Sequence, residues 1–399
     1  MVGLDNRGSY GGSFGHDCRH CQPRYAAPDG VWIMTQFTNI LRGLAAVSAF
    51  WAFLTGMLAF AETDRVLLLA AAVLLGAAFL PVQSRNNGGQ YDLAASLFGM
   101  VAVLMSLRGG MPSASWGLVI SSWLYGWLAV EKSMAIRGRS RFVELILSLA
   151  VPVFFGAWII FVWECLTIGL EIPMVLLPPP SAIAVRFAES TPILWADFQQ
   201  TVIKSALVGY VLGCGSAFIL AVLIDRVPFL QRGLLPIGNF ISALPIVGIA
   251  PIMVMWFGFD WQSKAAVVVV MTFFPMLVNT VAGLQTTQAM ERDLLRTYAS
   301  SYVQLLFKLR LPAAAPFIFN ALKINSTLAL IGAIVAEFFG TPIVGLGFRI
   351  STEVGRMNVD MAWAEICVAA IAGSLSYGLL SLLEKRVTFW HPSNRQKQV

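Results

Sequence analysis

The chain has 399 residues, of which 57% are hydrophobic and only 12% are charged, and its mean hydropathy is +0.73. So little charge cannot coat a soluble surface, and 34 Gly and 19 Pro are too few for a collagen-like or low-complexity disordered chain. A formal net charge of +6 does not by itself indicate nucleic-acid binding. The composition predicts an all-α integral membrane protein.

Ten apolar stretches are long enough to cross a membrane, since a bilayer core about 30 Å thick requires about 20 apolar residues per helix. The first stretch follows a polar, Gly-rich segment and is too long for a cleaved secretory signal, so we expect it to remain in the protein. The predicted spans cover residues 38–61, 65–82, 92–108, 114–130, 143–168, 197–225, 233–257, 265–285, 313–338 and 362–384.

Lys and Arg residues are distributed unevenly between the two sides of the predicted membrane. With the N-terminus in the cytoplasm, 20 of the 27 lie on the cytoplasmic side and 7 lie outside. Membrane proteins retain positive charge on the cytoplasmic side. We therefore expect a multi-pass protein with both termini in the cytoplasm.

A basic segment at 131–142 divides the predicted helices into two groups. Upstream, residues 35–130 form four helices with short loops, as in an antiparallel bundle. This bundle carries almost no intramembrane charge, which favours an accessory packing role over an ion path and leaves regulation as an alternative. Downstream, residues 143–390 form six helices separated by longer polar segments. Residues 1–34 and 391–399 are expected to be polar cytoplasmic tails.

Four potential metal ligands, His16, Cys18, His20 and Cys21, lie close together in the N-terminal tail. Four ligands would suffice for zinc, but a structural site usually takes a second pair from elsewhere in the chain. The other three cysteines lie in predicted spans and cannot supply that pair. We therefore expect a reduced cytoplasmic tail without metal, with metal binding or redox sensing as the weaker alternative.

The polar segment 288–312 between the eighth and ninth spans has the pattern of two short amphipathic helices. The small residue Ala299 lies at the break, and Leu311-Pro312 opens the next span, where proline is well tolerated. The apolar face of such a hairpin can lie in the groove of a partner protein. Packing on the membrane surface is an alternative that periodicity alone does not exclude.

This segment resembles the cytoplasmic coupling loop of ABC-importer permeases, which reads Glu-Ala-Ala, then Gly, then a terminal Leu-Pro. Here residues 293–295 read Asp-Leu-Leu, Ala299 replaces the glycine, and the Leu-Pro is present. Alanine adopts positive φ less readily than glycine, so the departure at 299 affects the geometry of the break. The resemblance makes Asp293, Ala299, Tyr302, Leu311 and Pro312 the candidate ATPase-coupling residues.

Further motifs resemble those of the nitrate/sulfonate/taurine branch of binding-protein-dependent permeases, in the same order and with similar spacing. The resemblance extends over residues 143–390 and does not include residues 1–130. Its segments are Leu177–Ser181, Trp256–Lys264, Phe273–Pro275, Asn279–Thr280, Gly283–Leu284, Ala336–Gly340 and Gly345–Gly347.

The resemblance implies a six-helix type I ABC-importer permease core, here preceded by the four-helix bundle, in a bacterial plasma (inner) membrane. It implies membrane lipid around the chain and three protein partners: a cytoplasmic ABC ATPase dimer, a second permease copy in a homodimer, and an extracytoplasmic solute-binding protein. The solute would be a small organic or inorganic anion, or a vitamin or pyrimidine precursor. No nucleic-acid partner is expected.

The chain lacks the Gly-x-x-x-x-Gly-Lys-Ser/Thr pattern that holds phosphates, because neither Lys132-Ser133 nor Lys204-Ser205 follows a glycine. We therefore expect a transport subunit without its own ATP site or cofactor, with ATP and Mg on the partner ATPase. A self-sufficient secondary transporter is the alternative, but it should show broken helices in matching halves and mid-membrane carboxylates. A membrane enzyme based on the His/Cys cluster lacks nearby acid and base residues.

Charged residues near the outer ends of the spans are expected to reach the membrane interface, as long side chains commonly do. Glu337 is also a candidate for the solute path, because it matches a family motif. Asn325 and Thr327 lie deeper in the same span, and these polar groups should face the path or the subunit interface rather than lipid. Packing between helices is an equal alternative for each. The outer charged residues are Glu164, Lys204, Lys264, Glu337 and Glu365.

Overall fold

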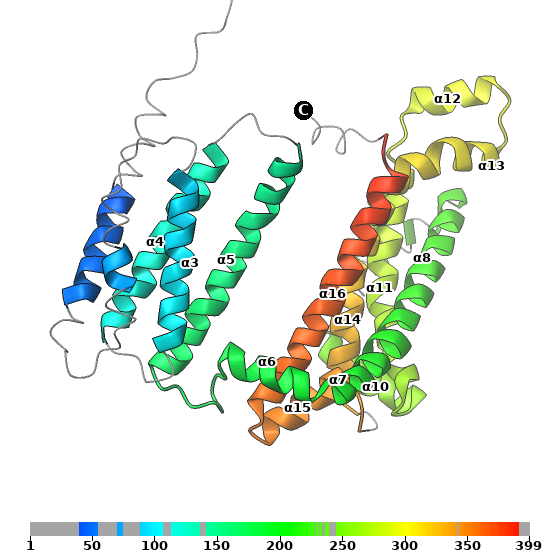
Figure 1. The fold of residues 1–399 in the computed structure, drawn as a ribbon. Coiled ribbons are helices and arrows are strands. Elements are labelled where there is room, and N and C mark those ends of the chain that lie inside the picture. The colour runs from blue at the N-terminus through cyan, green and yellow to red at the C-terminus, as the bar shows by residue number, and fades with distance from the viewer. Residues whose placement is uncertain are drawn as a thin grey trace, which may run out of the picture. The chain divides into compact units, whose positions relative to one another are not determined.

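The structure is a computed structural model of the 399-residue chain, and every regular element within its described residues is a helix. It divides into two compact units, Met1–Ile159 and Ile160–Val399, and the boundary falls inside helix α5 (Arg141–Gly169) (Figure 1). The described residues are 40–54, 70–74, 88–106, 113–135, 141–227, 229–230, 232–233, 236–238, 245–340 and 343–390.

In the first unit, α3 (Gly88–Ser106) and α4 (Ser113–Ala135) pack along each other. Their interface uses small residues, and the Ser96 hydroxyl donates across it to the backbone oxygen of Ser122 at 2.7 Å. The buried Tyr125 hydroxyl donates to the backbone oxygen of Leu74 at 2.7 Å. Small residues and interhelical hydrogen bonds are the usual means of packing helices in lipid, where apolar contact alone gives little preference.

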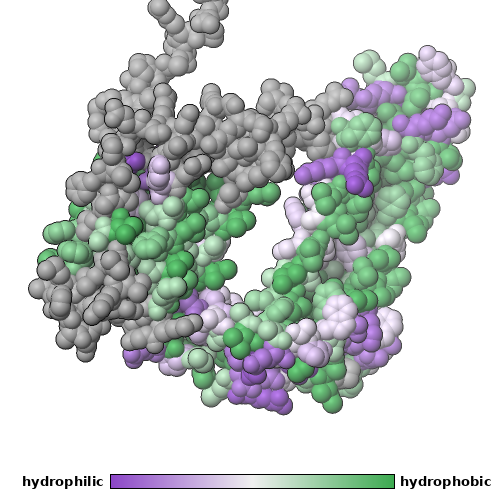
Figure 2. All heavy atoms as spheres, viewed as in Figure 1, coloured by the Kyte–Doolittle hydropathy of each residue, from purple (hydrophilic) through white to green (hydrophobic). Residues whose placement is uncertain are grey.

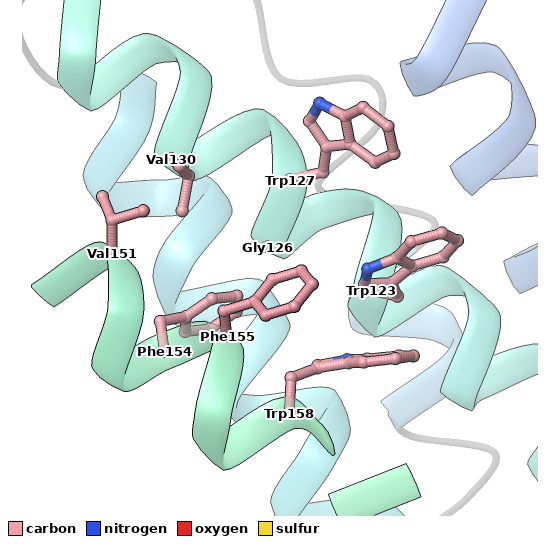
Figure 3. A pocket seen from close by; sticks show the side chains of 8 residues that line it. All are labelled: Trp123, Gly126, Trp127, Val130, Val151, Phe154, Phe155 and Trp158. Carbon is pink, nitrogen blue, oxygen red and sulfur yellow. The ribbon is translucent and has the colours of Figure 1, made fainter. Parts of the chain in front are cut away.

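An apolar pocket of about 210 Å³ lies between α4 and the middle of α5 (Figure 3). The rings of Trp123 and Trp158 stack with their centroids 5.2 Å apart. A Cβ atom at Gly126 would lie 2.3 Å from Phe154 Cζ, so the close approach of these two helices requires glycine there. The pocket is lined by Trp123, Gly126, Trp127, Val130, Val151, Phe154, Phe155 and Trp158.

The second unit has its long helices side by side, with short helices at both ends (Figure 1). Helices α12 and α13 form a hairpin at one end, and α6, α7 and α15 lie at the other. Hydrophilic residues gather at both ends, with hydrophobic residues between them (Figure 2). The elements are α6 (Pro180–Glu189), α7 (Thr191–Phe198), the π-helix η2 (Gln199–Leu207), α8 (Val208–Arg226), α10 (Ile246–Phe257), α11 (Trp261–Leu284), α12 (Ala289–Thr297), α13 (Tyr302–Leu305), the π-helix η3 (Leu306–Arg310), α14 (Leu311–Glu337), α15 (Leu346–Gly355) and α16 (Val359–Val387).

Helix α11 is the centre of this unit and packs against both α8 and α14. Small residues bring the axes close together: a Cβ atom at Gly213 of α8 would lie 2.1 Å from Thr272 Oγ1 of α11. The surrounding core contains Cys214, Met276 and Leu277, all buried. This tight packing holds α14 beside α11, with the short helices beyond its two ends.

Five described helices are long and apolar enough to cross a membrane, and they confirm a multi-pass protein whose described elements are all helical. Other predicted spans fall partly on residues outside the described ranges, so the count of ten remains a prediction. Helix α14 starts at Leu311 with Pro312 in its first turn, as predicted. The five segments are Val151–Gly169, Thr191–Arg226, Trp261–Leu284, Tyr302–Glu337 and Val359–Val387.

The prediction that outer charged side chains reach the membrane interface is wrong for four of the five residues. Glu164, Lys264, Glu337 and Glu365 are buried, with exposed fractions of 9%, 1%, 1% and 0%, whereas Lys204 is exposed. Burial of a charged group is costly unless the protein supplies partners. Here most of the partners come from other elements; the Ser181 backbone N–H, for example, donates to Glu164 Oε2 at 2.9 Å.

Candidate functional site

The hairpin at 288–310 has the two-helix form that the sequence predicts, and each of its first two helices begins with a reciprocal cap. Gln288 caps α12, and its backbone N–H donates to Glu291 Oε2 at 3.0 Å. Ser301 caps α13, and its backbone N–H donates to Gln304 Oε1 at 3.0 Å. Such capping boxes satisfy backbone donors that the first helical turn leaves free. Both helix starts are therefore fixed by local sequence.

Ala299 lies between the two helices with φ +54°, in the left-handed region. The predicted break at this residue is therefore confirmed, and Ala299 adopts a backbone conformation that glycine adopts more readily. Left-handed backbone costs a non-glycine residue about 1 kcal/mol. The chain bears this cost at the one position where α12 turns back toward α13.

The hairpin presents an exposed apolar face. Helix α12 has no buried residue, and Met290, Leu294 and Tyr298 are 78%, 58% and 77% exposed. A spacing of four residues places these side chains on one side of the helix axis. In the second arm, Val303 and Phe307 are also exposed, at 57% and 64%. We call these five residues the hairpin stripe.

A buried ion pair attaches the hairpin to the end of α8. The Arg310 guanidinium donates from Nη2 to Asp225 Oδ1 at 2.7 Å and from Nη1 to Asp225 Oδ2, and its Nε donates to the backbone oxygen of Leu284 at 3.1 Å. The Tyr302 hydroxyl donates to Asp225 Oδ2 at 3.2 Å, and the Arg226 guanidinium lies 4.2 Å from the centre of the Tyr302 ring. Tyr302 thus holds the hairpin to α8, while Leu311 and Pro312 start α14 directly after Arg310.

Sequence reasoning missed the pairing of Asp225 with Arg310, which is one of the 20 Lys and Arg residues assigned above to the cytoplasmic side. The available signal was an Asp-Arg pair at the end of one span and an Arg immediately before the Leu-Pro of another. By contrast, the candidate coupling residue Asp293 is 67% exposed and meets only Arg296, itself 74% exposed, at 3.4 Å. Asp293 is therefore available to a partner, whereas Asp225 is not.

At the opposite end of this unit, three side chains receive the first backbone N–H groups of the α15 region. Asp197 Oδ1 accepts from Gly345 N at 2.6 Å, and Thr201 Oγ1 accepts from Leu346 N at 2.8 Å. Glu337 Oε2 accepts from Gly347 N at 2.8 Å, and the Thr201 hydroxyl donates to the Glu337 carboxylate at 2.7 and 3.0 Å. We call Asp197, Thr201 and Glu337 the α15 cap. The π-helix η2 carries Thr201, and α14 ends on Glu337.

Two glycines permit this close approach, which explains the Gly-Leu-Gly motif at 345–347. A Cβ atom at Gly345 would lie 2.7 Å from the Glu337 carboxyl carbon, and φ of Gly345 is +143°. A Cβ atom at Gly347 would lie 2.1 Å from the backbone oxygen of Ile334. The first turn of α15 is therefore seated directly on the last turn of α14.

Arg349 adds charge to the same end. Its Nε donates to Asp197 Oδ2 at 2.7 Å and lies 3.8 Å from Glu365 Oε1. The pKa of the Arg349 guanidinium is raised, first of all because it donates hydrogen bonds to the Asp197 carboxylate. Arg349 therefore remains a cation and links α15 to α7 and to α16.

The three candidates for the solute path have different surroundings. Asn325 is fully buried, and its Nδ2 donates to the backbone oxygen of Thr272 at 2.8 Å and lies 3.3 Å from Cys214 Sγ. Glu337 is buried in the α15 cap. Thr327 is exposed, and its hydroxyl donates only within its own helix, to the backbone oxygen of Ile324 at 2.8 Å. Of the three, Thr327 is the side chain accessible from outside the chain.

The metal candidates His16, Cys18, His20 and Cys21 lie outside the described residues. Among the residues that the structure does describe, no group of three or more His, Cys, Asp or Glu side chains is arranged to hold a metal ion.

Comparison with known proteins identifies the second unit. Residues 209–389 match the family described as "Binding-protein-dependent transport system inner membrane component". A probable ABC transporter permease of Haemophilus influenzae is 31% identical over 220 residues, which are 55% of this chain and 89% of that protein. The formylaminopyrimidine transport permease ThiX of Halalkalibacterium halodurans is 29% identical, over 62% of this chain and 96% of its own length. The putative aliphatic sulfonates transport permease SsuC of Bacillus subtilis is 27% identical, over 59% of this chain and 86% of its own length.

These matches confirm the resemblance carried by the sequence motifs. They leave a substantial part of this chain outside each aligned region. The relatives are transport components of ABC systems rather than enzymes. The chain belongs to the binding-protein-dependent ABC importer permeases, in the nitrate/sulfonate/taurine branch.

Proposed function

We propose that this chain forms the solute pathway of an ABC importer and couples ATP hydrolysis by partner subunits to uptake of a small solute delivered by an extracytoplasmic binding protein. The observation that carries the proposal is the hairpin stripe, which exposes five apolar side chains on a hairpin whose base is fixed by the Asp225–Arg310 pair. An exposed amphipathic helix whose base is fixed fits the groove of a partner. The partner is a dimer of ABC ATPase subunits, which carry ATP and Mg; this chain has no ATP site of its own.

Each candidate coupling residue has a distinct part in this proposal. Asp293 is exposed and meets the ATPase, and Ala299 provides the left-handed turn that brings the two arms together. Tyr302 holds the second arm to Asp225. Leu311 and Pro312 pass the position of the hairpin directly into α14.

The pathway lies between two copies of the chain in a homodimer, and Thr327 is the residue we assign to its wall. Asn325 and Glu337 contribute from behind that wall, by holding α14 to α8 and α11 and to α15 respectively. Both termini and the hairpin are cytoplasmic, which leaves the α15 end outside. Residues 35–130 form an accessory bundle ahead of the permease core.

The solute is a small organic or inorganic anion, or a vitamin or pyrimidine precursor. The names of two relatives, for formylaminopyrimidine and for aliphatic sulfonates, support this range. Uptake into cells or vesicles that contain the whole importer, measured over sulfonates, nitrate and heteroaromatic precursors, would identify the class. Uptake of a panel member that also needs ATP would rule out the secondary transporter.

Copurification tests the coupling proposal. An ATPase of separate sequence should copurify with the parental chain, and Leu294→Asp should abolish this by placing a charge in the hairpin stripe. Arg296→Gln is the matched control, because position 296 lies about 200° around the helix from Leu294 and an exposed ion pair contributes little. Copurification that survives Leu294→Asp would contradict docking through the stripe. Solute uptake by the chain without any ATPase would contradict the proposed function itself.

A further inference from the structure

Helix α14 joins the hairpin to the α15 cap without interruption. It begins at Leu311, directly after the anchored Arg310, and ends at Glu337, whose carboxylate is part of the cap. Its 27 residues correspond to a rod about 40 Å long. Both ends of one helix are therefore tied by buried carboxylate contacts, one to α8 and the other to α15.

The start of α15 depends on groups from other helices. The residue that precedes it, Gly345, has no side chain to cap the free N–H groups of the first turn. Three consecutive N–H groups, from Gly345 to Gly347, instead donate to Asp197, Thr201 and Glu337. Free N–H groups that are buried without a partner cost about 1–3 kcal/mol each. The position of α15 is therefore set by where these three acceptors lie.

Glu337 is the only one of the three acceptors that lies on α14. Thr201 lies on η2 and bridges the other two elements, because its hydroxyl donates to Glu337 of α14 and accepts from Leu346 N of α15. The first turn of α15 also packs closely on α14, because the backbone of α14 leaves no space for a Cβ atom at Gly347. A shift of α14 along its axis therefore carries the acceptor for Gly347 with it.

We propose that Glu337 is a positioning residue that makes α15 follow α14, so that a displacement of the hairpin reaches the opposite end of the permease. The inference rests on the proposed function, in which an ATPase moves the hairpin. It extends that function by assigning α15 as the element that responds at the outer end. Glu337 acts on transport through Gly347 and Thr201, and it need not touch the solute.

The test uses the assembled importer, with its copurifying ATPase and its binding protein, in proteoliposomes. Glu337→Ala should lower the number of solute molecules imported per ATP hydrolysed by about tenfold, a typical size for coupling between distant sites. ATPase copurification and basal hydrolysis should remain at parental levels. Glu337→Gln should retain most coupling, because its amide oxygen can still accept from Gly347 or Thr201. Glu164→Ala is the matched control, since the buried carboxylate of Glu164 accepts from Ser181 N of α6 and is not part of the α15 cap.

A second readout separates positioning from general destabilisation. Spin labels at the exposed residues Ile331 of α14 and Val354 of α15, placed in only one of the two permease copies, should give one narrow distance in the parental protein and in Glu337→Gln. In Glu337→Ala the distribution should broaden, because α15 no longer follows α14. If Glu337→Ala does not accumulate in the membrane, Thr201→Val can replace it, because it removes the bridging hydroxyl at nearly constant volume. The import-to-hydrolysis ratio and the Ile331–Val354 distance distribution of Thr201→Val then test the inference.

Two results would overturn this inference. One is a parental import-to-hydrolysis ratio in Glu337→Ala or Thr201→Val, and the other is an unchanged Ile331–Val354 distance distribution. Failure of the proposed function would look different, because then no ATPase would copurify with the parental chain. The two failures are therefore distinguishable in one preparation.

Discussion

The Asp225–Arg310 pair should hold the hairpin in place, and Asp225→Asn is the change that tests it. Asparagine keeps the size of the side chain and one acceptor oxygen but removes the negative charge. The Arg310 side chain, only 10% exposed, would keep its hydrogen bond to Leu284 and lose its counter-ion. A guanidinium in that setting is partly desolvated and unpaired.

The expected cost follows from the burial of both partners. The Asp225 and Arg310 side chains are 6% and 10% exposed, and removal of one partner from a buried ion pair costs about 3–5 kcal/mol. Because an amide oxygen remains, the cost for Asp225→Asn should lie at the lower end of this range, at about 3 kcal/mol. Since 1.36 kcal/mol corresponds to a factor of ten, local opening of the hairpin should become about 150-fold more frequent.

Hydrogen exchange of the backbone amides in residues 302–310, in nanodiscs, measures this opening directly. Asp293→Asn is the matched control, because the Asp293–Arg296 pair is exposed and should change exchange by less than about fivefold. Equal exchange in the two variants would refute the reasoning. The proposed function predicts the opposite pattern for ATPase affinity, because it places the exposed Asp293 against the ATPase.

Further changes test other parts of the structure. Ala299→Trp should keep parental abundance in the membrane but lower solute-stimulated ATP hydrolysis about tenfold, because an indole at the turn prevents the hairpin from seating in its groove; parental hydrolysis would contradict that role. Gly347→Ala should lower the melting temperature in detergent, at a cost of about 1–3 kcal/mol, because its Cβ would lie 2.1 Å from a backbone oxygen of α14. Gly355→Ala in the same helix should leave the melting temperature unchanged, because nothing lies within 4 Å of the added Cβ. Equal shifts in the two variants would contradict the close packing of α15 on α14. A cysteine at Ser181 should react with an impermeant reagent added outside, and one at Ser140 should not; the reverse pattern would overturn the orientation.

Much of the helical architecture was predictable from local sequence. Hydropathy located the long helices, and Leu311-Pro312 marked the start of α14 correctly. The break at Ala299 also followed from spacing and residue size. The π-helix Gln199–Leu207 was not predictable, because its residues have the same apolar and polar pattern as an α-helix. Its wider turn depends on tertiary contacts such as those of Thr201.

The candidate site was predictable only at the hairpin. A hydropathy scale includes the free-energy cost of burying a carboxylate, and this led to the wrong expectation that the Glu337 and Glu164 side chains reach the membrane interface. It does not register partners such as Gly347 N and Ser181 N, which are backbone groups brought close by the fold. Asp225 and Arg310 are 85 residues apart in the chain, so their pairing could not be predicted from either one alone.

Helix α12 has no buried residue, and this should limit the abundance of the protein in a cell. A helix that is fixed only at its ends unfolds locally with ease, and local unfolding exposes backbone to proteases. A subunit made in excess of the proposed ATPase partner would display Met290, Leu294 and Tyr298 on such a helix. We expect orphan copies to be cleaved within the hairpin and removed, so that the stoichiometry of the complex is adjusted by degradation of unpartnered subunits.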